Sequence, residues 1–97
     1  MIHVLVKLTV KNFTALETFE RKAARIMVRY EGQILTAFET IRNENNTGEE
    51  IHILAFPDEA AFLAYRADAE LVELAKLRDE AIIKTDIHLS LTAKSYH

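Results

Sequence analysis

The chain has 97 residues, 49% of them hydrophobic and 28% charged, which is enough for one domain with one core, placed at residues 1–97. Its formal net charge of −3 excludes an extensive nucleic-acid surface, because such a surface needs a concentrated excess of lysine and arginine. The absence of cysteine excludes disulfides, thiolate nucleophiles and cysteine-based zinc sites.

The first half of the chain predicts a strand, a helix and a second strand. Residues 2–10 alternate with a period of two, which is typical of a strand. Residues 13–30 place apolar side chains at helical spacing, with a capping box that begins at Thr14 and with Gly32 placed to end the helix. Residues 33–42 form a second alternating run that is rich in β-branched side chains.

The second half repeats this order after an Asn-rich loop, which suits a turn between adjacent antiparallel strands. Residues 50–56 predict a short apolar strand. A Pro-Asp pair ends this strand and starts a helical stretch over residues 58–84, which we expect to break near Asp68. Residues 86–94 alternate again and predict the fourth strand.

Two strand-helix-strand units predict a ferredoxin-like α+β fold, βαββαβ, in which a four-stranded antiparallel sheet carries two helices on one face. We assign the even residues of the first strand and the odd residues of the third and fourth strands to the helix side. The opposite face then carries Leu5, Leu54 and Phe56 among polar side chains, and also three histidines: His3, His52 and His88. Because this face is too apolar to stay bare in water, we expect a homodimer through the sheet face.

A set of features in the second half carries a resemblance to a known superfamily. In chain order they are the strand end at Phe56-Pro57, the helix start at Asp58-Glu59-Ala60, Tyr65, the break near Asp68, and Leu77-Arg78. With the order of elements, this pattern resembles the dimeric α+β barrel superfamily, and within it a bacterial branch of uncharacterised function. Members of that branch often have a Gly-Gly-Arg-like start to strand 2 and an arginine before strand 3, where this chain has Gly32-Gln33 and Glu49-Glu50.

The resemblance implies two ferredoxin-like subunits packed sheet to sheet. The wider superfamily includes cofactor-independent monooxygenases, muconolactone isomerase-like enzymes, haem-binding proteins and ligand-sensing domains. The fold alone does not select among these functions. A cavity lined by apolar groups with converging polar side chains would favour binding or catalysis, whereas a filled interior would favour a role in assembly.

Arg78 is the first candidate site residue. A count of about 100° per residue places it near the middle of the apolar stripe of the predicted helix over residues 58–84. A buried guanidinium needs a carboxylate, carbonyl groups or an anionic ligand around it. Two interpretations stay open: a structural ion pair or a packed stem with its head in solvent, and an anchor for a substrate carboxylate or enolate.

The histidines are the next candidates. His3 and His52 begin strands that we expect to be parallel neighbours, so they should lie close together and could serve as general base or ligand. The alternative is that they are ordinary polar residues at strand ends. His88 should lie nearer the opposite end of the sheet, which argues against a three-histidine metal centre. His97 is terminal, and we expect it to be disordered.

Tyr65 and Phe56 complete the candidate ligand-binding residues. Tyr65 shares a helical face with Phe62, and these rings either pack on the sheet or close the mouth of a pocket. On the first helix, Glu17 and Glu20 are interspersed with basic side chains in what we interpret as a solvated face. The sequence has no Gly-rich phosphate loop, no HExxH motif and no nucleophile elbow, so we predict no cofactor and no metal.

Two functions of different class remain open from the sequence. The first is a homodimeric module that binds a small ligand or only assembles. The alternative is a cofactor-independent enzyme, monooxygenase- or isomerase-like, in which Arg78 orients an anionic or phenolic substrate and His52 or His3 moves a proton. Haem or metal binding through one histidine is a third. The chain leads directly into a strand, with no signal peptide and no apolar stretch long enough to cross a bilayer, so we expect a cytoplasmic protein without membrane contact.

Overall fold

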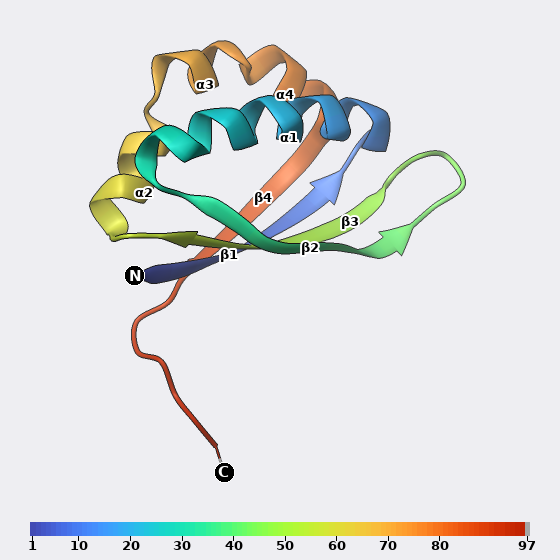
Figure 1. Cartoon of the computed structure of the whole chain (residues 1–97). Helices are drawn as coiled ribbons and strands as arrows, with labels where there is room; N and C mark the ends of the chain where they lie inside the picture. Colours follow the sequence, from blue (N-terminus) through green and yellow to red (C-terminus); the bar gives the residue numbers. More distant parts are fainter. Residues whose placement is uncertain (97) are drawn as a thin grey trace.

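The structure is a computed structural model that describes residues 1–96; His97, expected to be disordered, lies outside the described residues. Four antiparallel strands form one sheet in the order β2-β3-β1-β4, with the helices on one face (Figure 1). The strands are β1 at Ile2–Val10, β2 at Gln33–Arg42, β3 at Gly48–Phe56 and β4 at Ile82–Leu89. The helices are α1 at Phe13–Met27, α2 at Glu59–Arg66, α3 at Ala69–Glu73 and α4 at Ala75–Ala81, with a 3-10 turn, η1, at Val28–Tyr30. The predicted ferredoxin-like α+β fold is confirmed.

Short polar side chains start α1, α2 and α3 by accepting hydrogen bonds from backbone N–H groups of the first turn. Asn12 caps α1 in this way at 3.1 Å, so the capping box predicted from Thr14 is wrong. Thr14 lies inside the first turn, where its hydroxyl accepts a hydrogen bond from Asn46 instead. Asp58 caps α2 and Asp68 caps α3, so the expected break near Asp68 is confirmed.

The end of the first helix brings the chain close to the core. After η1, Glu31 takes the left-handed conformation, with φ at 58°, so it reverses the chain where Gly32 was expected to do so. Gly32 is needed for a different reason. A Cβ at this position would lie 2.3 Å from Cε1 of Phe56 and 2.6 Å from Cγ of Met27. The missing side chain therefore lets β2 start directly against the core.

The pairing of β1 with β3 decides which side chains face the helices. The two strands are antiparallel, with Val4 opposite Leu54 and Val6 opposite His52. Opposed residues project to the same face, so the even residues of β3 lie on the helix side with the even residues of β1. The assignment of Leu54, Phe56 and His52 to the open face is therefore wrong, and all three are buried. Over residues 51–56 only His52 interrupts apolar side chains, which occupy both faces, and Glu49 and Glu50 lie on opposite faces, so the sequence pattern of β3 does not decide the face.

The last strand begins earlier than predicted. The helical stretch expected over residues 58–84 forms three short helices and ends at Ala81, so the strand expected at 86–94 is shifted toward the N-terminus. The carbonyl of Ala81 accepts a hydrogen bond from the backbone N–H of Lys11 at 2.8 Å, which holds this point beside the end of β1. Two isoleucines follow directly, and β-branched side chains favour extended backbone.

The start of β1 limits β4 at its other end. Leu89 lies opposite Val4, which confirms the assignment of the odd residues of β4 to the helix side. The backbone N–H of Ser90 then donates to the carbonyl of His3 at 2.8 Å. Beyond this bond β1 offers almost no further residues to pair with, so Leu91 is fully exposed outside the strand rather than on the helix side.

β2 is an edge strand whose ladder is interrupted twice. Its pairing with β3 shifts between Ile34 and Thr36 and again between Glu39 and Ile41. Each shift adds one residue to β2, which bends the strand and increases its local twist.

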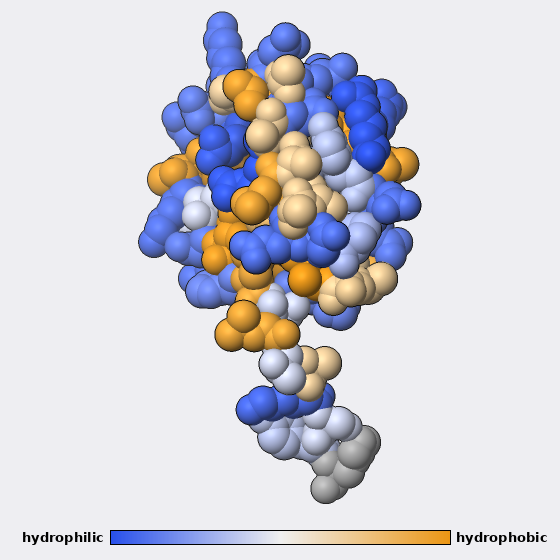
Figure 2. Space-filling view, turned by 90° about the vertical axis from the view of Figure 1, so that its left-hand side faces the viewer, coloured by the Kyte–Doolittle hydropathy of each residue, from blue (hydrophilic) through white to orange (hydrophobic). Residues whose placement is uncertain are grey.

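The face of the sheet away from the helices carries large apolar side chains. We call Leu5, Phe38, Ile51 and Ile53 the open-face patch. Leu5 lies opposite Ile53 and Phe38 opposite Ile51, and Phe38 is 50% exposed. Seen from the side, apolar surface also reaches the point where the C-terminal segment leaves the body (Figure 2).

Candidate functional site

A cavity of about 270 Å³ lies between the helices and the sheet. Its volume is near the lower end of pockets that hold small organic molecules, about 300 Å³. Most of its wall is apolar and includes Leu8 of β1, Phe19 of α1, Leu54 of β3, Phe62 of α2 and Ile87 of β4. Six polar or titratable side chains complete the lining: Glu20, His52, Tyr65, Arg66, Arg78 and Thr85.

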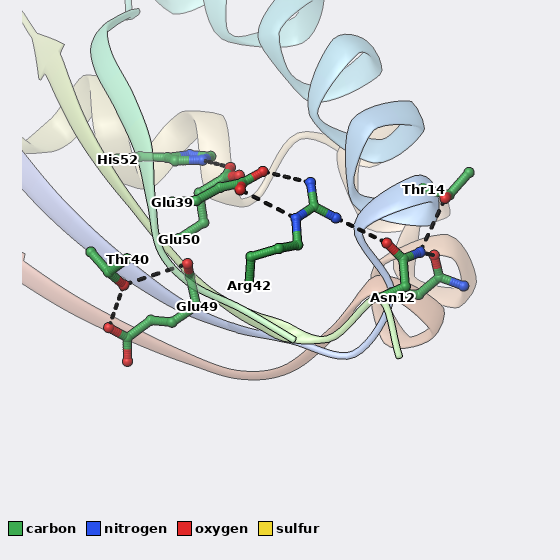
Figure 3. Close-up of polar contacts among 9 residues, drawn as sticks. Asn12, Thr14, Glu39, Thr40, Arg42, Glu49, Glu50 and His52 are labelled. Atoms are coloured by element: carbon green, nitrogen blue, oxygen red, sulfur yellow. Dashed lines mark hydrogen bonds and ion pairs between the residues drawn. The ribbon is translucent and has the colours of Figure 1, made fainter. Parts of the chain in front are cut away.

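His52 lies on the cavity wall and is 4% exposed. Its Nε2 is 2.5 Å from Oε2 of Glu50, which is two residues earlier on the same face of β3. Figure 3 shows the imidazole pointing at Glu50, with Glu39 and Arg42 beyond it. With Glu50 ionised and the imidazole of His52 neutral, the Nε2–H group donates a hydrogen bond to the carboxylate. The other ring nitrogen, Nδ1, then carries the lone pair.

Glu20 of α1 faces His52 from the helix side. Its Oε2 is 3.7 Å from Nδ1 of His52, and burial raises the pKa of Glu20, partly offset by His52 and reinforced by Glu50. Glu20 was expected on the solvated face of the first helix, so it was not among the predicted site residues. A signal was present: Glu20 lies four residues after Leu16 and three before Ala23, both on the buried stripe of the helix.

Tyr65 and Phe56 differ in their relation to the cavity. Tyr65 lines it, and burial, reinforced by the charge of Glu20, raises the pKa of the phenol, so its hydroxyl stays protonated. Phe56 is 1% exposed and does not line the cavity. Its ring centroid lies 5.3 Å from that of Phe62 and 5.6 Å from that of Tyr65. Phe56 therefore supports the wall from within the core.

Arg78 lines the cavity from α4, and Arg66 lines it from α2. Both side chains are exposed, so the predicted place of Arg78 in the middle of a buried stripe is wrong. The helical stretch breaks at Asp68 and again at Leu74, so a count through one continuous helix loses its phase, and Leu77 takes the inner position. Within residues 1–96 neither arginine forms an ion pair or a hydrogen bond, so no internal carboxylate holds Arg78.

Thr85 of β4 adds an unpaired polar group to the wall. Its Oγ1 is buried and has no hydrogen-bond partner among the described residues. Thr85 lies opposite Leu8, on the helix side of the sheet. A buried hydroxyl without a partner is unfavourable, so this atom can gain from a polar ligand or a water molecule.

His3 lies outside the cavity. It is exposed near the start of β1, opposite Ala55, on the face of the sheet away from the helices. The expected proximity of His3 and His52 is therefore wrong, because their strands are antiparallel and the two side chains project to opposite faces. In the part of the chain that the structure describes, no three His, Cys, Asp or Glu side chains are grouped to hold a metal ion, and no helix is long and apolar enough to span a membrane.

The comparisons with known proteins confirm the predicted resemblance, both in the ferredoxin-like fold and in a branch of uncharacterised function. Residues 2–89 match the family described as domain of unknown function DUF1330, and the chain belongs to this family. None of the curated proteins compared with the chain matches it.

Solved structures with the same fold include proteins of unknown function and proteins named as oxygenases. A protein of unknown function from Rhodopseudomonas palustris has a TM-score of 0.77 at 18% identity, covering 97% of this chain and 83% of its own. SnoaB, a cofactor-independent oxygenase from Streptomyces nogalater, has a TM-score of 0.68 at 16% identity, with 97% and 94% covered. A putative antibiotic biosynthesis monooxygenase from Nitrosomonas europaea has a TM-score of 0.67 at 11% identity, with 97% and 100% covered. These similarities establish the fold.

Proposed function

We propose that the protein binds a small organic ligand, with an apolar body and an anionic or phenolic group, in the cavity between the helices and the sheet. The observation that carries this proposal is the cavity of about 270 Å³, whose apolar wall is interrupted by a few converging polar side chains. A module that only assembled would be expected to fill this space with side chains, because protein interiors are close-packed.

The charges on the wall fit an anionic group. Arg66 and Arg78 line the cavity without carboxylate partners within residues 1–96. Because the guanidinium of Arg66 lies over the ring of Phe62, 6.0 Å from its centroid, we assign the pairing with a ligand carboxylate or phenolate to Arg78. Glu20 is the one acidic side chain among the described residues of the wall, and burial raises its pKa above that of an exposed glutamate. Tyr65 and Thr85 supply hydroxyl groups for further polar contacts.

A thermal-shift series tests the proposal. Wild type, Arg78→Ala and the control Arg25→Ala, which changes an exposed arginine of α1 outside the cavity, are heated with benzoate, 4-hydroxybenzoate and hexanoate. We expect at least one acid to stabilise wild type and the control, by about 2.7 kcal/mol at a hundred times its dissociation constant, and the shift to disappear in Arg78→Ala. Equal stabilisation of Arg78→Ala, or no stabilisation of wild type, would contradict the proposal.

Catalysis without a cofactor is the second candidate function. The observation that favours it is the imidazole of His52 on the cavity wall, 2.5 Å from the carboxylate of Glu50. A histidine oriented by a carboxylate is a common general base. An acid that binds in the thermal-shift series is incubated in air with wild type and with His52→Gln protein, and the mixtures are compared by mass spectrometry. A new product with wild type alone supports catalysis, and an unchanged ligand in both mixtures contradicts it.

We further propose a homodimer through the open-face patch. Leu5, Phe38, Ile51 and Ile53 form a contiguous apolar surface on the face that no helix covers, which is unfavourable in water. The ion pair of Lys7 with Glu49, at 3.4 Å, lies between paired strands on this same face and provides a polar border.

Charge placed in the patch tests the dimer. Phe38 is half exposed, so Phe38→Asp should leave the subunit folded and convert the dimer to a monomer. Leu63→Asp is the matched control, because Leu63 is similarly exposed on α2, away from the open face. Multi-angle light scattering gives the mass of each variant. A Phe38→Asp protein that remains dimeric would refute the assignment of this face.

A further inference from the structure

We infer that Glu50 sets His52 as a base toward the cavity, so that the cavity selects ligands with an acidic O–H group and holds them as anions. The inference rests on the proposed ligand binding and adds to it the protonation state of the ligand and the residue that controls it.

Glu50 acts on the cavity through His52. His52 lines the cavity, whereas Glu50 lines a separate, outer pocket beside α1 and β2 and does not reach the cavity itself. The 2.5 Å contact joins Oε2 of Glu50 to Nε2 of His52, and the other ring nitrogen, Nδ1, makes no contact with Glu50. Glu50 is therefore a positioning residue: it fixes the tautomer of an imidazole that a ligand can touch.

The lone pair of Nδ1 is not used by the protein. The nearest carboxylate oxygen is Oε2 of Glu20, at 3.7 Å, which is beyond hydrogen-bond distance. Burial raises the pKa of Glu20, so this carboxyl keeps its proton at a higher pH than an exposed glutamate does. The other charged groups on the wall are Arg66 of α2 and Arg78 of α4, both positive.

The proposed step moves one proton from the ligand to His52 and needs no other reactant. The O–H bond of the ligand breaks, its electron pair stays on oxygen, and the proton forms a new N–H bond at Nδ1 of His52. The resulting imidazolium lies between the ligand anion at Nδ1 and the carboxylate of Glu50 at Nε2. The reverse transfer on release restores the starting tautomer. A ligand without an acidic proton gains nothing from this arrangement.

4-Nitrophenol tests the inference because its neutral and ionised forms absorb at different wavelengths. Its spectrum is recorded in complex with wild type, Glu50→Gln, His52→Gln and the control Glu39→Gln, at a pH where the free probe is mostly neutral. Glu39 lies opposite Glu50 on the neighbouring strand but binds Arg42 rather than His52. Glu39→Gln therefore removes one negative charge next to the site, as Glu50→Gln does, without changing a contact of His52. Circular dichroism confirms that each variant is folded.

We expect the bound probe to be mostly ionised in wild type and in Glu39→Gln. In Glu50→Gln the ratio of ionised to neutral bound probe should fall about tenfold or more, and His52→Gln should hold only the neutral form. A bound probe as ionised in Glu50→Gln as in wild type would overturn the inference and leave ligand binding intact. Failure of wild type to bind 4-nitrophenol would also overturn it, whereas an Arg78-dependent shift with benzoate would still support the proposed function.

Discussion

Thr85 offers a sharp test of how the cavity wall is built, because its hydroxyl is buried without a partner among the described residues. Thr85→Val replaces this hydroxyl with a methyl group of nearly the same shape, so the cavity keeps its volume. Leaving a buried polar group unpaired costs about 1–3 kcal/mol. The substitution should therefore raise the free energy of unfolding by about 1 kcal/mol or more, which corresponds to a rise in Tm of about 4–8 °C for a domain of this size.

Differential scanning calorimetry of the ligand-free protein measures this change. Thr18→Val is the control, since Thr18 is exposed on α1 and its substitution should change stability by less than about 0.5 kcal/mol. A Tm for Thr85→Val at or below that of wild type would refute the reasoning, because it would mean that the hydroxyl is satisfied in solution.

Two further substitutions probe the site and its support. Burial raises the pKa of Glu20 above its ordinary value of 4.5, so the folded state binds this proton more tightly than the unfolded state. The free energy of unfolding should thus decline as pH rises through the folded pKa. Urea unfolding at a series of pH values measures this decline, which Glu20→Gln should remove. An unchanged dependence of stability on pH in the variant would contradict the burial of this carboxyl. Gly32→Ala should lower stability by about 1–3 kcal/mol in the same assay, because its Cβ would overlap Phe56, and a neutral effect would show that the ring can move.

The elements that the sequence predicts well are those with local causes. The alternation of β1 matches its observed bounds, and Asp58 and Asp68 cap helices as expected, because a cap depends only on a short polar side chain and the next turn. The order of elements then leaves few topologies, and the ferredoxin-like fold is the observed one.

The parts that the sequence did not predict depend on contacts between distant segments. β3 carries apolar side chains and one glutamate on each face, so only its antiparallel register with β1 decides that His52 faces the helices. Arg78 does not lie on the buried stripe where it was predicted, because the helical stretch breaks at Leu74. No capping side chain at Leu74 indicates this break in the sequence. Glu20 was visible on the buried stripe of α1, and a search for charged residues on apolar helical faces would have found it.

The irregular edge of the sheet bears on how the protein avoids aggregation. A regular edge strand exposes unpaired N–H and C=O groups on which strands of other molecules can add. The two bulges bend β2 out of a regular ladder, and the salt bridge of Glu39 with Arg42 adds charge to this edge. At the opposite edge, β4 carries Lys84 and Asp86 as an ion pair at 3.6 Å. Growth of fibrils by strand addition is thus disfavoured at both edges, and concentrated solutions of this protein should remain clear.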